Sequence, residues 1–160
     1  MAKAKRSDRI VFHVTETAGE KSYEAIGKDN DELTREMNNE VESKENVLGE
    51  TSTEITKAPQ VTTVDPIYYR DDSKLAKKLH DIEWNDLDGD DLEEEFMEVD
   101  KTQETSGEYA AFLQKGKIDL KSVGGDTKGL AYPFDINWVG KKTYGTFNPE
   151  TKTFTPTVNA

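Results

Sequence analysis

Side chains that could do acid–base chemistry are abundant in this sequence, but their spacing selects none of them. His13 and His80 are its two histidines; the first falls in an apolar, strand-like run and the second in a helical stripe. Neither has a nucleophile or an acid at a diagnostic spacing, so both are expected to be packed or surface histidines. Carboxylates crowd residues 81–100, yet nothing sets apart one pair whose pKa values would diverge. The sequence thus predicts no catalytic residue and no enzyme.

One stretch partly matches a calcium-binding loop. Asp86, Asp88, Gly89 and Glu95 fall on the third, fifth, sixth and twelfth positions of an EF-hand loop. The first position is Trp84, which cannot bind calcium, and the residues that follow are strand-like rather than helical. We therefore expect no EF-hand and assign no metal ligand and no cofactor. A looser calcium site among these carboxylates stays open, and calorimetric titration with calcium would test it.

The composition fits one domain, residues 1–160, with a core of moderate size. Hydrophobic residues make up 33% and charged residues 34%, with a mean hydropathy of −0.85, so a lone globule would have a thin core. Such a chain either keeps long solvated segments or completes its burial in an assembly. There is no cysteine, which excludes disulfides and thiolate zinc sites. No apolar run approaches the roughly 20 residues of a membrane span.

The negative charge is concentrated in one segment. Residues 81–100 hold eleven acids and no Lys or Arg, which leaves 22 acids and all 21 bases for the other 140 residues of a chain whose net charge is −12. This segment would repel nucleic acid, so binding to a phosphate backbone is not expected as the main activity. It is either a solvated acidic loop that keeps the monomer in solution or a repulsive lining for a passing polyanion, and the two are compatible.

The first half of the chain reads as strands. Residues 9–15 are β-branched and aromatic, and with residues 22–26 they predict a hairpin around the Gly19 turn. Leu33, Met37 and Val41 are spaced by four, which fits a helix as well as one face of a strand, and we take a strand. The Thr-rich stretch that follows predicts a long extended loop over about residues 42–66.

One helix is predicted over residues 73–84, flanking the strands. Its apolar stripe recurs at the helical spacing, and Asp72 or Ser73 would be the N-cap. The stripe consists of Leu75, Leu79 and Ile82.

The last forty residues alternate turns and strands. The cluster Gly124-Gly125-Asp126 predicts a tight reversal, and because no Gly-Lys-Ser/Thr follows, it is not a phosphate cradle. Phe134, Ile136 and Trp138 alternate with polar residues, which predicts one buried face of a strand. Asn148-Pro149-Glu150 predicts a second hairpin. We expect a mainly β fold: an antiparallel β-sandwich or partial barrel with one flanking helix.

Three successive blocks, 122–129, 132–140 and 145–156, read SVGGDTKG, then YPFDINWVG, then GTFNPETKTFTP. This order resembles the C-terminal half of the major tail protein (tail tube protein) family of long-tailed bacteriophages, the siphophages. The resemblance extends over about two-thirds of the chain, from Leu33 onward, and is most specific after Ser122. It implies a structural virion protein whose copies form homohexameric rings that stack into a tail tube, the channel for DNA ejection.

The resemblance also implies partners and places. The subunit would bind itself and other tail proteins at the tube ends, in a virion tail assembled in the bacterial host cytoplasm, with no membrane. The tape-measure protein and DNA would pass through the lumen without specific binding. The extended loop would reach neighbouring subunits, and the inter-subunit contacts would be Thr53, Ile55, Pro59, Val61 and Val64. Strands at 118–120 and 134–138 would pair across subunits to close the ring.

Two alternatives belong to other classes. An acidic, calcium-dependent adhesion or carbohydrate-binding β-sandwich would use Tyr68, Tyr69, Trp84 and Trp138 for stacking. A DNA mimic that occupies a nucleic-acid-binding enzyme is suggested only by the acidic cluster. An adhesion module would stay monomeric and bind a ligand, a mimic would release a basic enzyme at high salt, and a tube protein would polymerise.

Overall fold

The computed structural model describes residues 2–157 and is mainly β, with an antiparallel, sandwich-like arrangement and one flanking helix, as the sequence predicted. The strands are β1 (Arg9–Thr17), β2 (Glu20–Ala25), β3 (Arg35–Glu36), β4 (Glu40–Glu45), β5 (Thr51–Thr56), β6 (Val61–Tyr68), β7 (Glu93–Thr105), β8 (Glu108–Leu120), β9 (Gly124–Asp126), β10 (Gly129–Asn148) and β11 (Thr153–Pro156). The helix α1 is Lys74–Trp84, and two short 3-10 turns are Arg6–Asp8 and Gly89–Leu92. None of the helices among these residues is long and apolar enough to cross a lipid bilayer.

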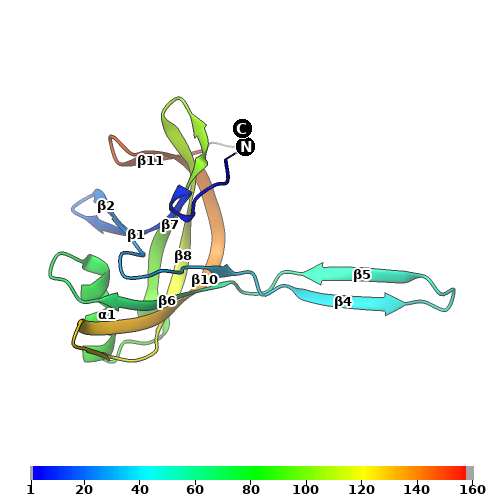
Figure 1. Cartoon of the computed structure of the whole chain (residues 1–160), viewed down its shortest axis with the longest axis horizontal. Helices are drawn as coiled ribbons and strands as arrows, with labels where there is room; N and C mark the ends of the chain where they lie inside the picture. Colours follow the sequence, from blue (N-terminus) through cyan, green and yellow to red (C-terminus); the bar gives the residue numbers. More distant parts are fainter. Residues whose placement is uncertain (1, 158–160) are drawn as a thin grey trace.

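Nine strands form one curved sheet in the order β2-β1-β7-β8-β10-β6-β3, with β9 and β11 added along β10. We call this sheet together with α1 the body. Strand β10 is its longest element and pairs with four others, so it holds both ends of the body together. Strands β4 and β5 form a separate two-stranded sheet that points away from the body along the longest axis of the molecule (Figure 1).

The main core lies between α1 and one face of the sheet. The Ser73 hydroxyl accepts a hydrogen bond from the Ala76 backbone N–H, so Ser73 is the N-cap. The helix then buries its predicted stripe, Leu75, Leu79 and Ile82, against the sheet. The predicted inward face of β10 is also confirmed, because Phe134, Ile136 and Trp138 all lie in this core cluster. A second, smaller apolar cluster includes Met97, Val99 and Phe147.

The N-terminal hairpin is confirmed as β1 and β2, which pair antiparallel. His13 is fully buried in β1, where its ring packs against Phe96 and its Nε2 lies 3.2 Å from Glu94 Oε1. His80 is partly exposed on α1. His13 is therefore a packed histidine and His80 a surface one, as predicted.

The acidic segment is only partly a loop, which corrects the prediction for residues 81–100. Its second half begins β7, an interior strand between β1 and β8, with Phe96, Met97 and Val99 buried. The acids of this strand are tolerated because other strands of the sheet supply cations. Glu98 pairs with Arg9 of β1, Glu93 with Lys115 of β8, and Glu95 with Lys21 of β2, the strand beyond β1. Composition alone did not reveal these cross-strand partners.

The glycine pair does not make the reversal predicted for it. Gly124 and Gly125 lie within β9, and the chain turns at residues 127–128 instead. Gly125 nevertheless has φ +138, and a Cβ there would approach the Gly129 carbonyl oxygen to 2.1 Å. The reversal therefore still depends on a glycine, but through close approach of two backbones. The predicted second hairpin is confirmed as β10 and β11.

Of the two strands expected to close a ring between subunits, one is paired on both sides within its own chain. Residues 134–137 of β10 pair with β8 on one side and with β6 on the other, so the prediction that this strand pairs across subunits is wrong. Residues 118–120 of β8 pair with β10 but extend beyond the last β7 pair, Glu93 opposite Lys117, so their pairing across subunits stays a prediction. The terminal strands of the sheet order are β2 and β3.

Candidate interaction surface

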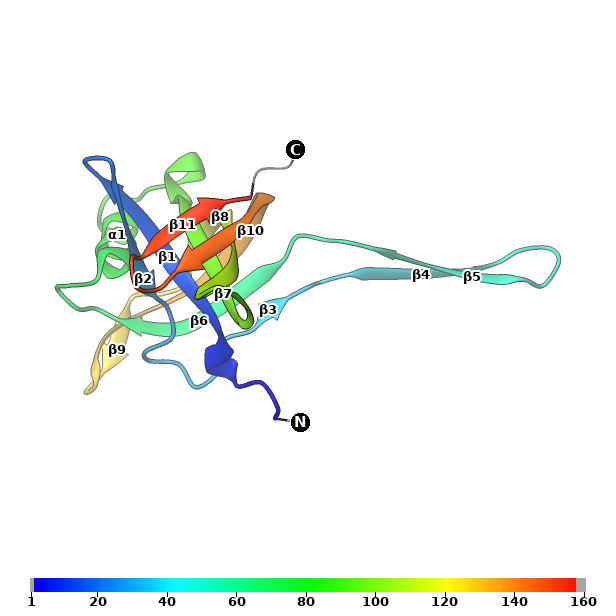
Figure 2. The same ribbon diagram turned by 90° about the horizontal axis from the view of Figure 1, so that it is seen from above.

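The most unusual feature of the molecule is the projecting hairpin, residues 40–56, which we call the arm. Every residue of the arm is exposed. Both views show it extending from one end of the molecule, with α1 at the other end (Figures 1 and 2). The arm therefore owes its strand structure to its own pairing and not to burial against the body.

Turn chemistry fixes the register of the arm. At its tip, Asn46 accepts hydrogen bonds on Oδ1 from the backbone N–H groups of Leu48 (2.9 Å) and Glu50 (3.0 Å). Gly49 follows with φ +78, a conformation that glycine adopts without steric cost. From this turn the pairing continues to Glu40 opposite Thr56. The predicted extended loop over 42–66 is thus a regular hairpin for most of its length.

The root of the arm is attached to the edge of the sheet. Arg35 and Glu36 of β3 pair with Thr62 and Val61 of β6. Beyond them the Asn38 side chain donates to the Pro59 carbonyl oxygen at 3.0 Å. These contacts hold the two strands of the arm together where they leave the body.

The arm exposes large apolar side chains on a surface with no partner in the described chain. Val41 and Ile55 lie directly opposite each other and are 66% and 65% exposed. Val47 and Leu48 are exposed at the tip. An isolated two-stranded hairpin is marginal in water, and exposed apolar groups on it are typical of a surface that a partner covers.

The residues predicted to contact neighbouring subunits separate into two groups. Thr53 and Ile55 are exposed on the arm, and Pro59 is exposed at its root. Val61 is half-buried in β6, and Val64 is completely buried in the core of its own subunit. Val64 is therefore wrong as an inter-subunit contact, because the body strand β6 begins at Val61 and turns Val64 inward.

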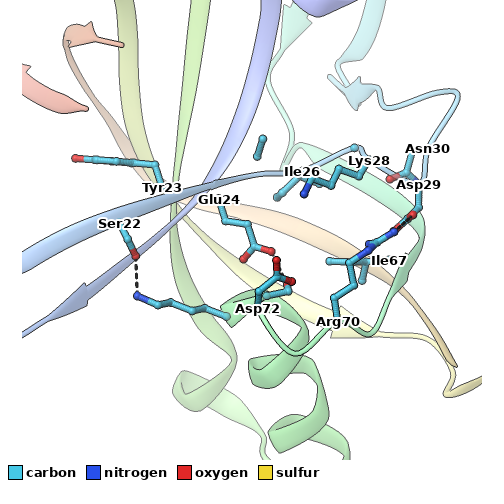
Figure 3. A pocket seen from close by; sticks show the side chains of 14 residues that line it. Ser22, Tyr23, Glu24, Ile26, Lys28, Asp29, Asn30, Ile67, Arg70 and Asp72 are labelled. Carbon is cyan, nitrogen blue, oxygen red and sulfur yellow. Dashed lines mark hydrogen bonds and ion pairs between the residues drawn. The ribbon is translucent and has the colours of Figure 1, made fainter. Parts of the chain in front are cut away.

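A pocket between β2 and the start of α1 collects several acidic and basic side chains (Figure 3). Asp29 accepts hydrogen bonds from both terminal nitrogens of Arg70, at 2.7 and 2.5 Å, and from the Tyr68 backbone N–H at 3.1 Å. The hydrogen bonds from Arg70 hold the pKa of the Asp29 carboxyl below its usual value. The Asp29 carboxylate thus links the loop after β2 to Arg70, which lies just before α1.

The second carboxylate of that pocket is also engaged. Glu24 accepts hydrogen bonds from the Ser73 hydroxyl and from the Leu75 backbone N–H, so it satisfies donors in the first turn of α1. Among the pocket's labelled residues, Figure 3 shows Glu24 and Asp29 on separate segments that face different partners. The pocket therefore ties the helix to the sheet, and its acids are not arranged for catalysis.

Within residues 2–157 there is no group of three or more His, Asp or Glu side chains placed to hold a metal ion. The region that matched part of an EF-hand contains the short 3-10 turn Gly89–Leu92 and then enters β7. Asp90 lies 3.3 Å from Lys117. Calcium binding by these carboxylates stays a prediction, which calorimetric titration with calcium would test.

The four proposed stacking residues do not form one platform. Trp138 is buried, and its indole N–H donates to Thr62 Oγ1 at 2.8 Å. Trp84 is exposed and stacks on His80 with ring centroids 5.5 Å apart, and Tyr69 meets the other side of His80 edge-on at 6.3 Å. Tyr68 is half-buried at the end of β6.

No known family model and no curated protein matches this sequence.

Proposed function

We propose that this protein is a structural subunit that polymerises with copies of itself, as stacked hexameric rings forming a bacteriophage tail tube. The observation that carries the proposal is the arm, a fully exposed hairpin with apolar side chains and no contact that buries it. The resemblance of the three blocks after Ser122 to tail tube proteins supports this assignment. The tube would be the channel through which DNA leaves the capsid.

The energetics of the arm favour docking onto another subunit. Burying a Val, Leu or Ile side chain contributes about 1.5–3 kcal/mol, and Val41, Val47, Leu48 and Ile55 together offer four such side chains. The arm is already paired and in register, so less conformational entropy is lost on docking than for a disordered loop. A neighbouring subunit that covers these residues would therefore be bound by a preformed element.

Ring closure in this proposal uses the ends of the sheet. Strands β2 and β3 are the terminal strands of the sheet order, and each offers unpaired backbone groups on one side. Pairing the β2 edge of one subunit with the β3 side of the next repeats the same contact around a ring. Closed rings of this kind leave no sheet edge in solution.

Net charge is compatible with passage of DNA. A subunit of net charge −12 repeated six times carries few sites where phosphates would be held. Asp86, Asp88 and Asp91 are exposed in the segment between α1 and β7, and α1 lies at the end of the molecule opposite the arm (Figure 1). We therefore propose a lumen of negative or near-neutral charge, with this turn at the exterior or between rings.

The test is a shortened arm. Val41 and Ile55 lie opposite each other, so replacing residues 42–54 by Asn-Gly leaves a two-residue hairpin and keeps β3 and β6 intact. The variant should melt at the wild-type temperature as a monomer and should form no tubes in negative-stain micrographs of concentrated protein. A matched control, Thr51→Ser, retains the arm and should assemble as the wild type does.

Tubes of normal length from the shortened protein would rule out the arm as the assembly element. If neither protein forms any oligomer, alone or with its tail partners, the structural assignment itself fails.

A second candidate is an adhesion or carbohydrate-binding module. The observation that favours it is the row Tyr69, His80 and Trp84, whose last member is 71% exposed. Ligand binding there should change the fluorescence of Trp84 and should be lost in Trp84→Ala. Unchanged fluorescence across a glycan panel, with and without calcium, would dismiss this candidate.

A further inference from the structure

A cluster of cations lies at the root of the arm, in a pocket of a strongly acidic protein. Strand β10 is irregular between Val139 and Thr143, where the register against β8 shifts. Beside this irregularity is a surface depression that we call the root pocket, lined by Lys57, Gln60, Gln114, Trp138, Lys141 and Lys142. Its three lysines come from two distant segments and face one depression.

A buried guanidinium lies behind the floor of the root pocket. The Arg35 guanidinium stacks on the Trp138 ring, 4.1 Å from its centroid, and donates through Nη1 to Gln60 Oε1 (3.0 Å) and Gln114 Oε1 (2.9 Å). Its Nε and Nη2 are buried and have no hydrogen-bond partner within residues 2–157. Buried charged donors without partners are costly, so this guanidinium calls for negative charge close by.

The subunit itself supplies too little of that charge. Glu98 is the acid whose charge acts on both Arg35 and Lys142, and it is already bonded to Arg9. Burial lowers the pKa of Arg35. The pKa of Lys142 is also lowered, mainly by burial and secondly by the positive charge of Arg35. Lys142 extends over the Phe112 ring, 4.6 Å from its centroid, so it is held in place beside the pocket. The root pocket thus has more positive charge than the nearby acid of its own subunit, Glu98, can balance.

The arm carries the opposite imbalance. It contains five acids and one lysine, and Glu42 lies directly opposite Glu54 on one face. Like charges directly opposite each other destabilise a strand pair. Lys44 is 3.6 Å from Glu42, but both side chains are about two-thirds exposed, so this contact offsets little. In the described chain neither glutamate pairs with a cation of the root pocket.

We propose that the root pocket of one copy binds the Glu42 and Glu54 carboxylates on the arm of a second copy. This inference rests on the proposed self-assembly through the arm and names the docking site. The Cβ atoms of two directly opposed strand residues lie about 5 Å apart, so Glu42 and Glu54 present their carboxylates side by side, which suits a pocket with several separate cations. Lys57, Lys141 and Lys142 would contact the carboxylates, while Arg35 adds a fixed positive charge behind them.

A carboxylate of a second copy is favoured over a nucleic-acid phosphate. The pocket is one small depression on a chain of net charge −12, and so the long-range field of the protein repels DNA. The field does not prevent a second copy from docking if the arm inserts locally, and such pairing fixes register between copies.

The test exchanges charges between the two surfaces. Glu42→Lys with Glu54→Lys should raise the critical concentration for assembly at least about tenfold, because two cations would then face the root pocket. Lys57→Glu with Lys141→Glu should do the same, and both changes leave the half-buried Arg35 and Lys142 in place. Mixing the two variants should restore assembly across alternate contacts, since each then offers the charges that the other lacks.

Controls separate a local effect from a general one. Glu45→Lys changes the charge of the same arm on its other face and should assemble within about twofold of the wild type. The melting temperature of each monomer shows that the exchanges leave the fold intact. Binding of a fluorescent oligonucleotide, compared between the wild type and the Lys57/Lys141 variant, tests whether the root pocket binds phosphate instead.

The outcomes are distinguishable. If shortening the arm abolishes assembly but both charge exchanges assemble normally, the root pocket is not the docking site and the proposed function stands. If the lysine exchange removes oligonucleotide binding and leaves assembly unchanged, the pocket takes phosphate and the inference is overturned. Failure of the mixture to recover also contradicts it.

Discussion

The body and the arm are both antiparallel β-structure from one chain, but different forces hold them. In β10 every second side chain from Tyr132 to Trp138 is buried, and both edges of the strand are paired. In the arm the same two-residue period buries nothing, and the turn at Asn46 fixes the pairing. Backbone pairing and turn chemistry are therefore enough to form strands here, whereas burial determines which strands stabilise the subunit.

Their charges differ in the same way. The acids of β7 pair with cations from β1, β2 and β8, so a strand with five acids among its first eight residues can lie inside a sheet. On the arm, Glu42 and Glu54 face each other, and the one cation of the arm, Lys44, is 3.6 Å from Glu42 in an exposed contact that offsets little of this charge. Acids of the body are paired with cations of other strands, whereas the acids of the arm are left to the surface that we expect a second copy to cover.

The largest expected difference between the regions is in core deletions. Phe134→Ala should lower the free energy of unfolding by about 3–5 kcal/mol, because the ring is completely buried against α1 and the sheet. Ile55→Ala on the arm should change it by no more than about 0.5 kcal/mol. Urea unfolding of the monomers measures both. Equal losses for the two variants would mean that the arm packs on its own body in solution.

The next effect concerns the backbone of the body. Gly125→Val should cost about 1–3 kcal/mol, since φ +138 disfavours a side chain and its Cβ would collide with the Gly129 carbonyl. Gly124→Val is the matched control, because that residue has no positive φ and open space around its Cβ position. Thermal unfolding compares the two. A Gly125 variant as stable as its Gly124 counterpart would show that β9 moves freely.

A smaller effect is expected at the tie between residue 29 and the helix. Asp29→Asn should cost about 1–2 kcal/mol at neutral pH, because Arg70 loses a charged acceptor. The folded pKa of Asp29 is depressed, so its contribution is present above the ordinary carboxyl range near 4 and is lost as pH falls through the folded value. The difference between wild type and variant should therefore shrink below about pH 4.

Exposed Asp31, changed to Asn, serves as the control for that measurement. A gap between wild type and Asp29→Asn that stays constant down to pH 2 would contradict the role assigned to the ion pair.

The smallest effect on folding is expected at the turn between α1 and β7. Replacing its four aspartates by Asn should shift the free energy of unfolding by no more than about 0.5 kcal/mol in total, because exposed charges contribute little to stability. The four residues are Asp86, Asp88, Asp90 and Asp91. We expect the salt dependence of tube assembly to change while DNA delivery continues. Blocked DNA ejection from normal particles would place this turn in the channel.

Much of the body could be predicted from local pattern. Alternation marked the inward face of β10, the apolar stripe and its cap marked α1, and the turn at Asn148 marked the last hairpin. These features depend on residues within one or two turns of each other, so the sequence displays them directly. Thr53 and Ile55 came instead from the resemblance to tail tube proteins; the structure places both on the exposed arm, and their role as contacts stays a prediction.

What the sequence by itself determined is thus the period of each element and the position of most turns. Tertiary structure alone decided that the acids after Glu93 lie in an interior strand, that Val64 faces its own core, and that Arg35 stacks on Trp138, more than 100 residues away. The physical reason is that burial and charge compensation depend on which strands become neighbours. Which strands become neighbours is decided by long-range pairing, and the local pattern of residues does not determine it.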